Sequence, residues 1–159
     1  MKKTDASLKK FAIDGIVPFG TRLAVDPASM YIKTKQEYDE LIQRSKDEDF
    51  ALLIDFDATW CPPCKRIGPI FNGFSLHCDP RKILLKKVDV DENSEAAQAA
   101  KIQAMPTFQV YKGGEIAETM TGASDDRLKD LIRKYGGKTG DKDDGPDGDD
   151  AEEANQSNN

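Results

Sequence analysis

Short apolar stretches separated by polar residues run through the middle of the chain and predict strands that alternate with helices. Five stretches rich in apolar or β-branched residues predict strands at 30–33, 52–58, 83–90, 107–111 and 116–121. The last two flank Lys112-Gly113-Gly114-Glu115, which is typical of a hairpin turn. The second begins with the apolar run Leu52-Leu53-Ile54, so we expect this strand to be buried at the centre of a sheet.

Apolar residues three and four positions apart predict helices between these strands. The helices cover 34–46, a segment that starts near residue 61, 94–101 and 124–135. Thr34 and Glu37 form a capping box for the first helix, and Ser94 and Ser124 can cap the third and fourth. The order β-α-β-α-β-α-β-β-α predicts an α/β fold of three layers, with a central mixed sheet of about five strands flanked by helices.

The 159 residues divide into one domain and two extensions. Residues 1–29, interrupted by prolines and glycine, predict a partly ordered N-terminal extension, and residues 30–137 form the predicted domain. Residues 138–159 hold eight of the 29 acidic residues but two of the 23 lysines and arginines, so the net charge of −6 arises there. Few side chains in this tail could offset the chain entropy lost on folding, so we expect it to be disordered.

Composition and charge exclude several classes of function. A domain with balanced charge lacks the basic patch that nucleic-acid binding requires, and no stretch reaches the ~18–20 apolar residues of a membrane span. Charged residues between Asp5 and Asp14 interrupt any signal-peptide core, and three cysteines are too few for a disulfide-rich secreted scaffold. We therefore expect a cytoplasmic protein, and we expect it to be a monomer.

Cys61 and Cys64 are separated by two residues and follow the central predicted strand, which is typical of a redox-active dithiol. Cys64 begins an apolar helical stripe, so it should be sheltered, whereas Cys61 should be exposed at the helix start. Free N–H groups and the helix dipole there favour a thiolate, the species that attacks disulfides. Pro62 and Pro63 suit the first turn of a helix. The stripe comprises Cys64, Ile67, Phe71, Phe74 and Cys78.

Two further features point to the same chemistry. Asp55 interrupts an apolar strand, and burial should raise the pKa of its carboxyl group. It could then accept the proton of Cys64, through a water molecule; alternatively it faces solvent or pairs with Lys87. Pro106 directly precedes a predicted strand, and a cis Met105-Pro106 bond would leave backbone groups of Met105 free for a bound peptide.

At this point the chain resembles the thioredoxin family over residues 30–136. The motifs that carry the resemblance occur in the order and spacing of that family: Asp55-Phe56-x-Ala58-Thr59-Trp60-Cys61-x-Pro63-Cys64-Lys65, Pro69, Lys87-Val88-Asp89-Val90-Asp91, Met105-Pro106-Thr107 and Gly122. The resemblance implies a thioredoxin-like fold. It also implies a protein-disulfide reductase that exchanges dithiols for disulfides and serves cell redox homeostasis.

The resemblance implies a role for each site residue. Cys61 would be the nucleophile and Cys64 the resolving thiol, Asp55 the buried proton acceptor with Lys87 beside it, and Pro106 a cis-proline that positions substrate. The docking surface would comprise Trp60, Pro62, Met105, Pro106, Gly122 and Ala123. The implied partners are disulfide-containing client proteins and a thioredoxin reductase that passes on electrons from NADPH, with no cofactor or metal bound to the chain itself.

Two residues depart from the family pattern. Pro62 stands where glycine is commonest and removes one N–H group near the thiolate, so we expect a shifted reduction potential. Asp57 stands where many relatives carry tryptophan or a small residue. Its carboxylate would either oppose ionisation of Cys61 and select basic clients, or be a solvated surface acid with little effect.

Other interpretations remain open at this stage. A zinc site built from Cys61, Cys64, His77 and Cys78 conflicts with the distance of Cys78 along the helix, near 20 Å, and Cys78 itself should be buried and inert. The main alternative function is a thioredoxin-fold binding module that docks on a partner through its unusual ends, with redox turnover secondary. An oxidase or isomerase is a third option.

Overall fold

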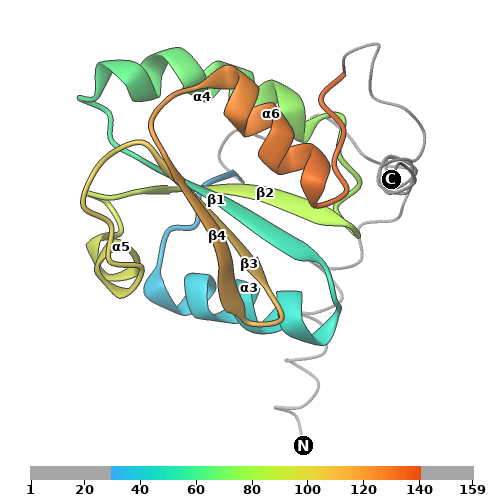
Figure 1. Cartoon of the computed structure of the whole chain (residues 1–159). Coiled ribbons are helices and arrows are strands. Elements are labelled where there is room, and N and C mark those ends of the chain that lie inside the picture. Colours follow the sequence, from blue (N-terminus) through green and yellow to red (C-terminus); the bar gives the residue numbers. More distant parts are fainter. Residues whose placement is uncertain (1–29, 141–159) are drawn as a thin grey trace, which may run out of the picture.

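The computed structural model describes residues 30–140, which form a central sheet covered by helices on both faces (Figure 1). The sheet has the strand order β2-β1-β3-β4, in which β1 is parallel to β2 and antiparallel to β3, and β3 is antiparallel to β4. The predicted α/β fold with a mixed sheet is therefore confirmed. The elements in chain order are α3 (Lys35–Asp47), β1 (Ala51–Asp57), α4 (Pro62–Ser75), β2 (Ile83–Asp89), α5 (Ser94–Ala99), β3 (Thr107–Lys112), β4 (Glu115–Thr121) and α6 (Asp125–Lys134).

The prediction of a strand at 30–33 is wrong, because the pairing of this segment with the sheet is limited to one isolated bridge. Tyr31 lies parallel to Lys87 of β2, and the N–H of Ile32 donates to the carbonyl oxygen of Lys87 at 2.8 Å. Thr34 then caps α3, so the chain turns into a helix before a ladder can form. The sheet accordingly has four strands rather than the expected five within residues 30–140.

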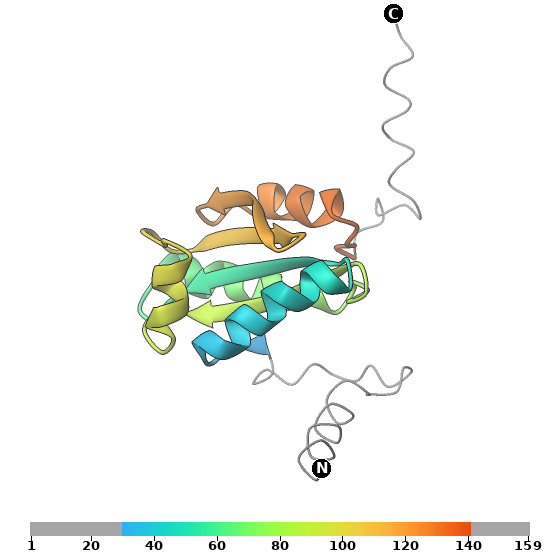
Figure 2. The same cartoon turned by 90° about the horizontal axis from the view of Figure 1, so that it is seen from below.

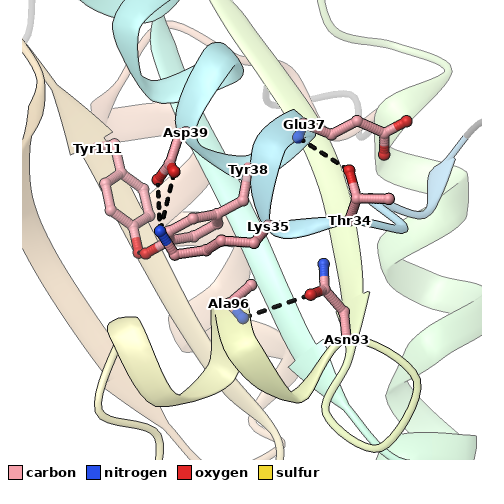
Figure 3. Close-up of polar contacts among 8 residues, drawn as sticks. All are labelled: Thr34, Lys35, Glu37, Tyr38, Asp39, Asn93, Ala96 and Tyr111. Carbon is pink, nitrogen blue, oxygen red and sulfur yellow. Dashed lines mark hydrogen bonds and ion pairs between the residues drawn. The ribbon is translucent and has the colours of Figure 1, made fainter.

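Side-chain caps define the starts of α3 and α5 (Figure 3). Thr34 Oγ1 accepts a hydrogen bond from the N–H of Glu37 at 3.0 Å, as the sequence predicted. For α5 the predicted cap, Ser94, is wrong: Asn93 Oδ1 accepts from the N–H of Ala96 at 3.3 Å. The amide nitrogen of Asn93 also donates to the carbonyl oxygen of Ile32 at 3.1 Å, which ties α5 to the segment before α3.

Two apolar clusters fill the space between the sheet and its helices. One cluster packs beneath α4 and α6 and includes Leu53, Phe71 and Phe108, and the other packs beneath α3 and α5 and includes Leu52 and Tyr111 (Figures 1 and 2). Every residue of β1 is buried. Because side chains of a strand alternate between its faces, the odd-numbered residues of β1 face α4 and the even-numbered ones face α3.

The segment after α6 packs on the domain beyond the predicted boundary at residue 137. Arg133 Nη2 donates to Thr139 Oγ1 at 2.9 Å, Thr139 is buried, and the thiol of Cys78 donates to the carbonyl oxygen of Lys138 at 3.4 Å. The predicted N-terminal extension 1–29 and the tail from 141 onward lie outside the described residues. Among the described helices, none combines the length and apolar character needed to cross a membrane.

We predict that Phe71→Ala lowers the free energy of unfolding by about 3–5 kcal/mol. Phe71 is fully buried, and the centre of its ring lies 5.7 Å from that of Phe108, so truncation leaves a cavity between α4 and β3. Leu76→Ala is the matched control, since Leu76 is 58% exposed at the end of α4, and it should change stability by about 0.5 kcal/mol or less. Denaturant unfolding of both variants is the measurement, and equal losses would contradict the assigned packing.

Candidate functional site

Cys61 and Cys64 form a disulfide at the point where β1 passes into α4. Their Cα atoms are 5.2 Å apart, and both side chains are only 4% exposed. The expectation that Cys61 is exposed is therefore wrong for the disulfide form. The bond turns its sulfur toward Cys64, and both residues pack with Ala58 against Met105 and Val90.

The backbone around the disulfide is arranged to receive a negative charge. Cys61 is the N-cap of α4, and its Sγ accepts the N–H of Cys64 at 3.2 Å. Pro62 and Pro63 occupy the first two helical positions and carry no N–H, so Cys64 supplies the first free donor of the helix. In the reduced protein this N–H and the helix dipole would favour the thiolate of Cys61.

Asp55 lies in β1 on the face covered by α4, and its side chain is buried with 1% exposure. Neither carboxyl oxygen has a hydrogen-bond partner among the described residues. Burial, together with the nearby negative charge of Asp57, raises the pKa of Asp55 to about 8, and Lys87 only partly opposes this. The possibility that Asp55 faces solvent is thus excluded, and the carboxyl group holds its proton at neutral pH.

Lys87 pairs with Asp57 rather than with Asp55. In the sheet register Lys87 lies beside Asp55, but its Nζ is 3.4 Å from Asp57 Oδ2. The hydroxyl group of Tyr31 donates to the same oxygen at 3.1 Å. Asp57 is 6% exposed, so its interpretation as a solvated surface acid is wrong. Burial raises the pKa of Asp57, while Lys87 and Tyr31 counteract that rise.

The other predicted site residues surround the disulfide. Trp60 is 61% exposed beside Cys61, and Pro62 follows at the start of α4. The Met105–Pro106 peptide bond is cis, and the carbonyl oxygen of Met105 lies 3.8 Å from Cys61 Sγ. In the segment after β4, the N–H of Gly122 donates to the carbonyl oxygen of Pro106 at 2.9 Å, and Ala123 is the next residue.

Three residues that the sequence did not single out hold this site in place. Asp91 Oδ2 accepts the indole N–H of Trp60 at 2.8 Å. Arg66 reaches from α4 to the carbonyl oxygen of Ala123 and to Asp125 Oδ1, the latter at 3.1 Å, and Tyr31 binds Asp57. Of these only Asp91 carried a signal. It follows the end of β2, and the carboxyl ends of parallel strands lie at one edge of the sheet.

The zinc interpretation finds no support in the described part of the chain, where no group of three or more His, Cys, Asp or Glu side chains is placed to hold a metal ion. Cys78 is buried with 6% exposure, as the sequence predicted, but it lies three residues beyond the end of α4 rather than on the helix. The site therefore consists of one disulfide, a buried acid on the sheet face covered by α4, and a lysine held by a second acid.

We predict that Asp55→Asn makes the oxidised protein more stable than wild type above about pH 4. An unfolded aspartic acid ionises near pH 3.9, whereas Asp55 in the fold retains its proton to about pH 8. Wild-type stability therefore falls as pH rises between these values, by up to about 1.4 kcal/mol per pH unit.

Denaturant unfolding at several pH values, followed by the fluorescence of Trp60, checks this expectation. The difference between Asp55→Asn and wild type should vanish near pH 4 and grow toward pH 8. Asp130→Asn, at an exposed position of α6, serves as the control. A difference between Asp55→Asn and wild type that stays constant with pH would contradict the raised pKa.

Comparison with known proteins agrees with this geometry. The family model described as Thioredoxin matches residues 29–134. A thioredoxin H-type of Chlamydomonas reinhardtii is 44% identical over 104 residues, covering 65% of this chain and 91% of the relative. A thioredoxin of Coprinus comatus is 43% identical over 103 residues, covering 65% and 93%.

Solved structures show the same relationship. The oxidised thioredoxin of Plasmodium falciparum superimposes with a TM-score of 0.58 at 40% identity, covering 67% of this chain and 96% of that one. The thioredoxin of Malassezia sympodialis gives a TM-score of 0.60 at 38% identity, covering 66% and 90%. With a family match over most of the described residues and a disulfide at the start of α4, this chain belongs to the thioredoxin family and is a dithiol–disulfide oxidoreductase.

Proposed function

We propose that this protein reduces disulfides of client proteins and is itself reduced by a thioredoxin reductase that draws electrons from NADPH. The observation that carries the proposal is the Cys61–Cys64 disulfide at the N-terminus of α4, next to the exposed ring of Trp60. The chain would need no bound cofactor for this exchange, because the two cysteines carry both electrons. Cys78 is a buried thiol outside the disulfide, which suits a reducing compartment, and we propose the cytoplasm.

The reaction would proceed in two exchanges. The Cys61 thiolate attacks one sulfur of a client disulfide, forming a mixed disulfide while the second client sulfur leaves as a thiolate. Cys64 then loses its proton and attacks Cys61 Sγ. The Cys61–Cys64 bond forms, the mixed disulfide breaks, and the client departs with both sulfurs reduced. Two electrons have passed from the dithiol to the client.

Asp55 is the proposed acceptor for the proton that Cys64 loses. It faces α4 from β1, and neither of its oxygens is occupied by a partner among the described residues. Its pKa of about 8 lies near the working pH, where a carboxyl group can both take and return a proton. A water molecule would carry the proton between the thiol and the carboxylate.

The client would bind over the disulfide. Trp60, Pro62, Met105, Pro106, Gly122 and Ala123 are the proposed contact residues, and the structure brings them together from three separate segments of the chain. Gly122 has φ of +103°, a conformation that favours glycine, so the backbone turns sharply beside Pro106. The absence of a side chain at this point would leave room for an extended peptide beside Pro106.

Reduction of insulin disulfides with NADPH and a thioredoxin reductase tests the proposal. We expect turnover by wild type and a loss to the background rate in Cys61→Ser, because the attacking thiolate is gone. Cys78→Ser is the matched control and should retain turnover, since that thiol lies buried beyond the far end of α4. Absence of turnover by folded wild-type protein would refute reduction through this route.

Cys64→Ser separates the two exchanges. This variant can form the mixed disulfide but cannot resolve it, so we predict that clients accumulate as covalent adducts on Cys61. Non-reducing gels of a cell lysate incubated with the variant provide the measurement, with the Cys61→Ser, Cys64→Ser double variant as the control. If the double variant captures the same adducts, attack by Cys61 is not their source.

The alternative of a binding module that acts through its ends makes the opposite prediction for truncation. Residues 138–140 contact the domain, so the informative truncation ends at Gly140 rather than at 137. A reductase should keep its insulin-reducing rate after removal of residues 141–159. Partner binding that is lost on this truncation but retained in Cys61→Ser would favour the binding module.

A further inference from the structure

Lys87 has two carboxyl groups within the reach of its side chain. Asp55 and Asp57 are two residues apart in β1 and therefore point to the same face, which α4 covers. Lys87 comes from the parallel neighbour β2 and is paired in register with Asp55. The register alone would place the ammonium group next to Asp55, yet its Nζ is found at Asp57.

Contacts from two other segments explain where the ammonium group lies. The hydroxyl of Tyr31 donates to Asp57 Oδ2, which is also the oxygen that faces Lys87 Nζ. The ring of Tyr31 lies 5.3 Å from the same nitrogen, a cation–π distance. On the α4 side, a Cβ atom at Gly68 would lie 3.4 Å from Nζ, at van der Waals contact, so α4 packs closely over the ammonium group.

An open cavity of about 290 Å³ borders this cluster. Its lining includes Tyr31, Asp57 and Lys87 on one side and Cys64 and Gly68 of α4 on the other. This volume is far more than the ~10–15 Å³ that one water molecule requires. Asp55 is not among the described residues that line the cavity. Water can therefore reach the Asp57–Lys87 pair, whereas Asp55 stays buried behind that pair.

We propose that Asp57 is a positioning residue for the resolving exchange: with Tyr31, its carboxylate holds the Lys87 ammonium group beside the cavity and keeps it from pairing with Asp55. The consequence follows from the sign of each charge. Asp57 places a negative charge near Asp55, and it keeps the positive charge of Lys87 away from Asp55. Both effects favour the protonated form of the Asp55 carboxyl group. This inference rests on the role proposed above for Asp55 as proton acceptor.

The charged and titratable groups around Asp55 come from few elements. Asp57 lies on its own strand and Lys87 on β2, and on α4 the cysteine Cys64 does not titrate in the disulfide. On β3 the register partner of Asp55 is Phe108, which does not titrate. Tyr31 interacts with both acids, because its hydroxyl donates to Asp57 and it also lies within electrostatic range of Asp55. Asp89 acts on Asp57. Apart from a substitution of Lys87 itself, substitution of Asp57 should therefore shift the titration midpoint of Asp55 more than any other single substitution.

Titration of the Asp55 carboxyl carbon by ¹³C NMR in the oxidised full-length protein tests the proposal, because the cysteines do not titrate in the disulfide. In Asp57→Asn, Lys87 is released toward Asp55, and the Asp55 midpoint should fall by about 1–3 pH units. Tyr31→Phe removes the hydrogen bond to Asp57 without a change of charge, and it should shift the midpoint in the same direction by less. Tyr31→Phe can therefore still test the proposal if Asp57→Asn folds poorly.

Asp89→Asn is the matched control. Asp89 is the register partner of Asp57 at the end of β2, and its Oδ1, which asparagine retains, accepts the N–H of Asp91 at 2.9 Å. It removes one negative charge from the same end of the sheet without releasing Lys87, so the Asp55 midpoint should move little. An unchanged midpoint in Asp57→Asn, or an equal shift in Asp89→Asn, would overturn the proposal.

A kinetic measurement separates this proposal from the role of Asp55. The rate at which Cys64 resolves a preformed mixed disulfide is followed against pH through the fluorescence of Trp60. In Asp57→Asn its midpoint should fall together with that of Asp55. If the NMR midpoint falls but the kinetic profile does not follow, the proton-acceptor role of Asp55 and the link of Asp57 to the resolving exchange are both overturned, whereas insulin reduction by wild type is unaffected.

Discussion

Burial of β1 on both faces is the constraint on which the rest of the structure depends. Its even-numbered apolar side chains pack beneath α3 and α5, so the odd-numbered ones must face α4. Asp55 and Asp57 are odd-numbered, and they are thereby brought beneath the helix that begins at the disulfide. A slip of one residue in the strand register would turn both acids to the opposite face and remove them from the site.

Asp55 shows how the fold accepts a local loss of stability for the sake of chemistry. A buried carboxyl group without a hydrogen-bond partner is costly, and its ionised form is more costly still. The surrounding apolar packing, which includes fully buried residues from β1, α4 and β3, offsets this cost. A proton can then be held on the sheet face covered by α4 at neutral pH, which an exposed aspartic acid could not do.

Local signals in the sequence predicted most elements and the main site residues. Alternating apolar stretches located the four strands of the sheet and the helices within a few residues, and the Cys-x-x-Cys spacing located the disulfide. The errors arose where distant contacts decide. Asn93 caps α5 because its amide also binds the segment before α3, and Tyr31 forms one bridge because α3 begins soon after. Cys61 is buried because the disulfide turns it inward.

The sequence by itself determined the strand and helix order, the position of the two reactive cysteines at a helix N-terminus, and the place of Asp55 in the apolar strand that precedes them, since each follows from spacing along the chain. Only the tertiary structure decided which acid Lys87 binds. The lysine side chain is long enough to reach either carboxylate, so the outcome depends on contacts from Tyr31, which approaches from another segment and binds both Asp57 and Lys87. These contacts are set by packing between elements, and no periodicity within one segment encodes them.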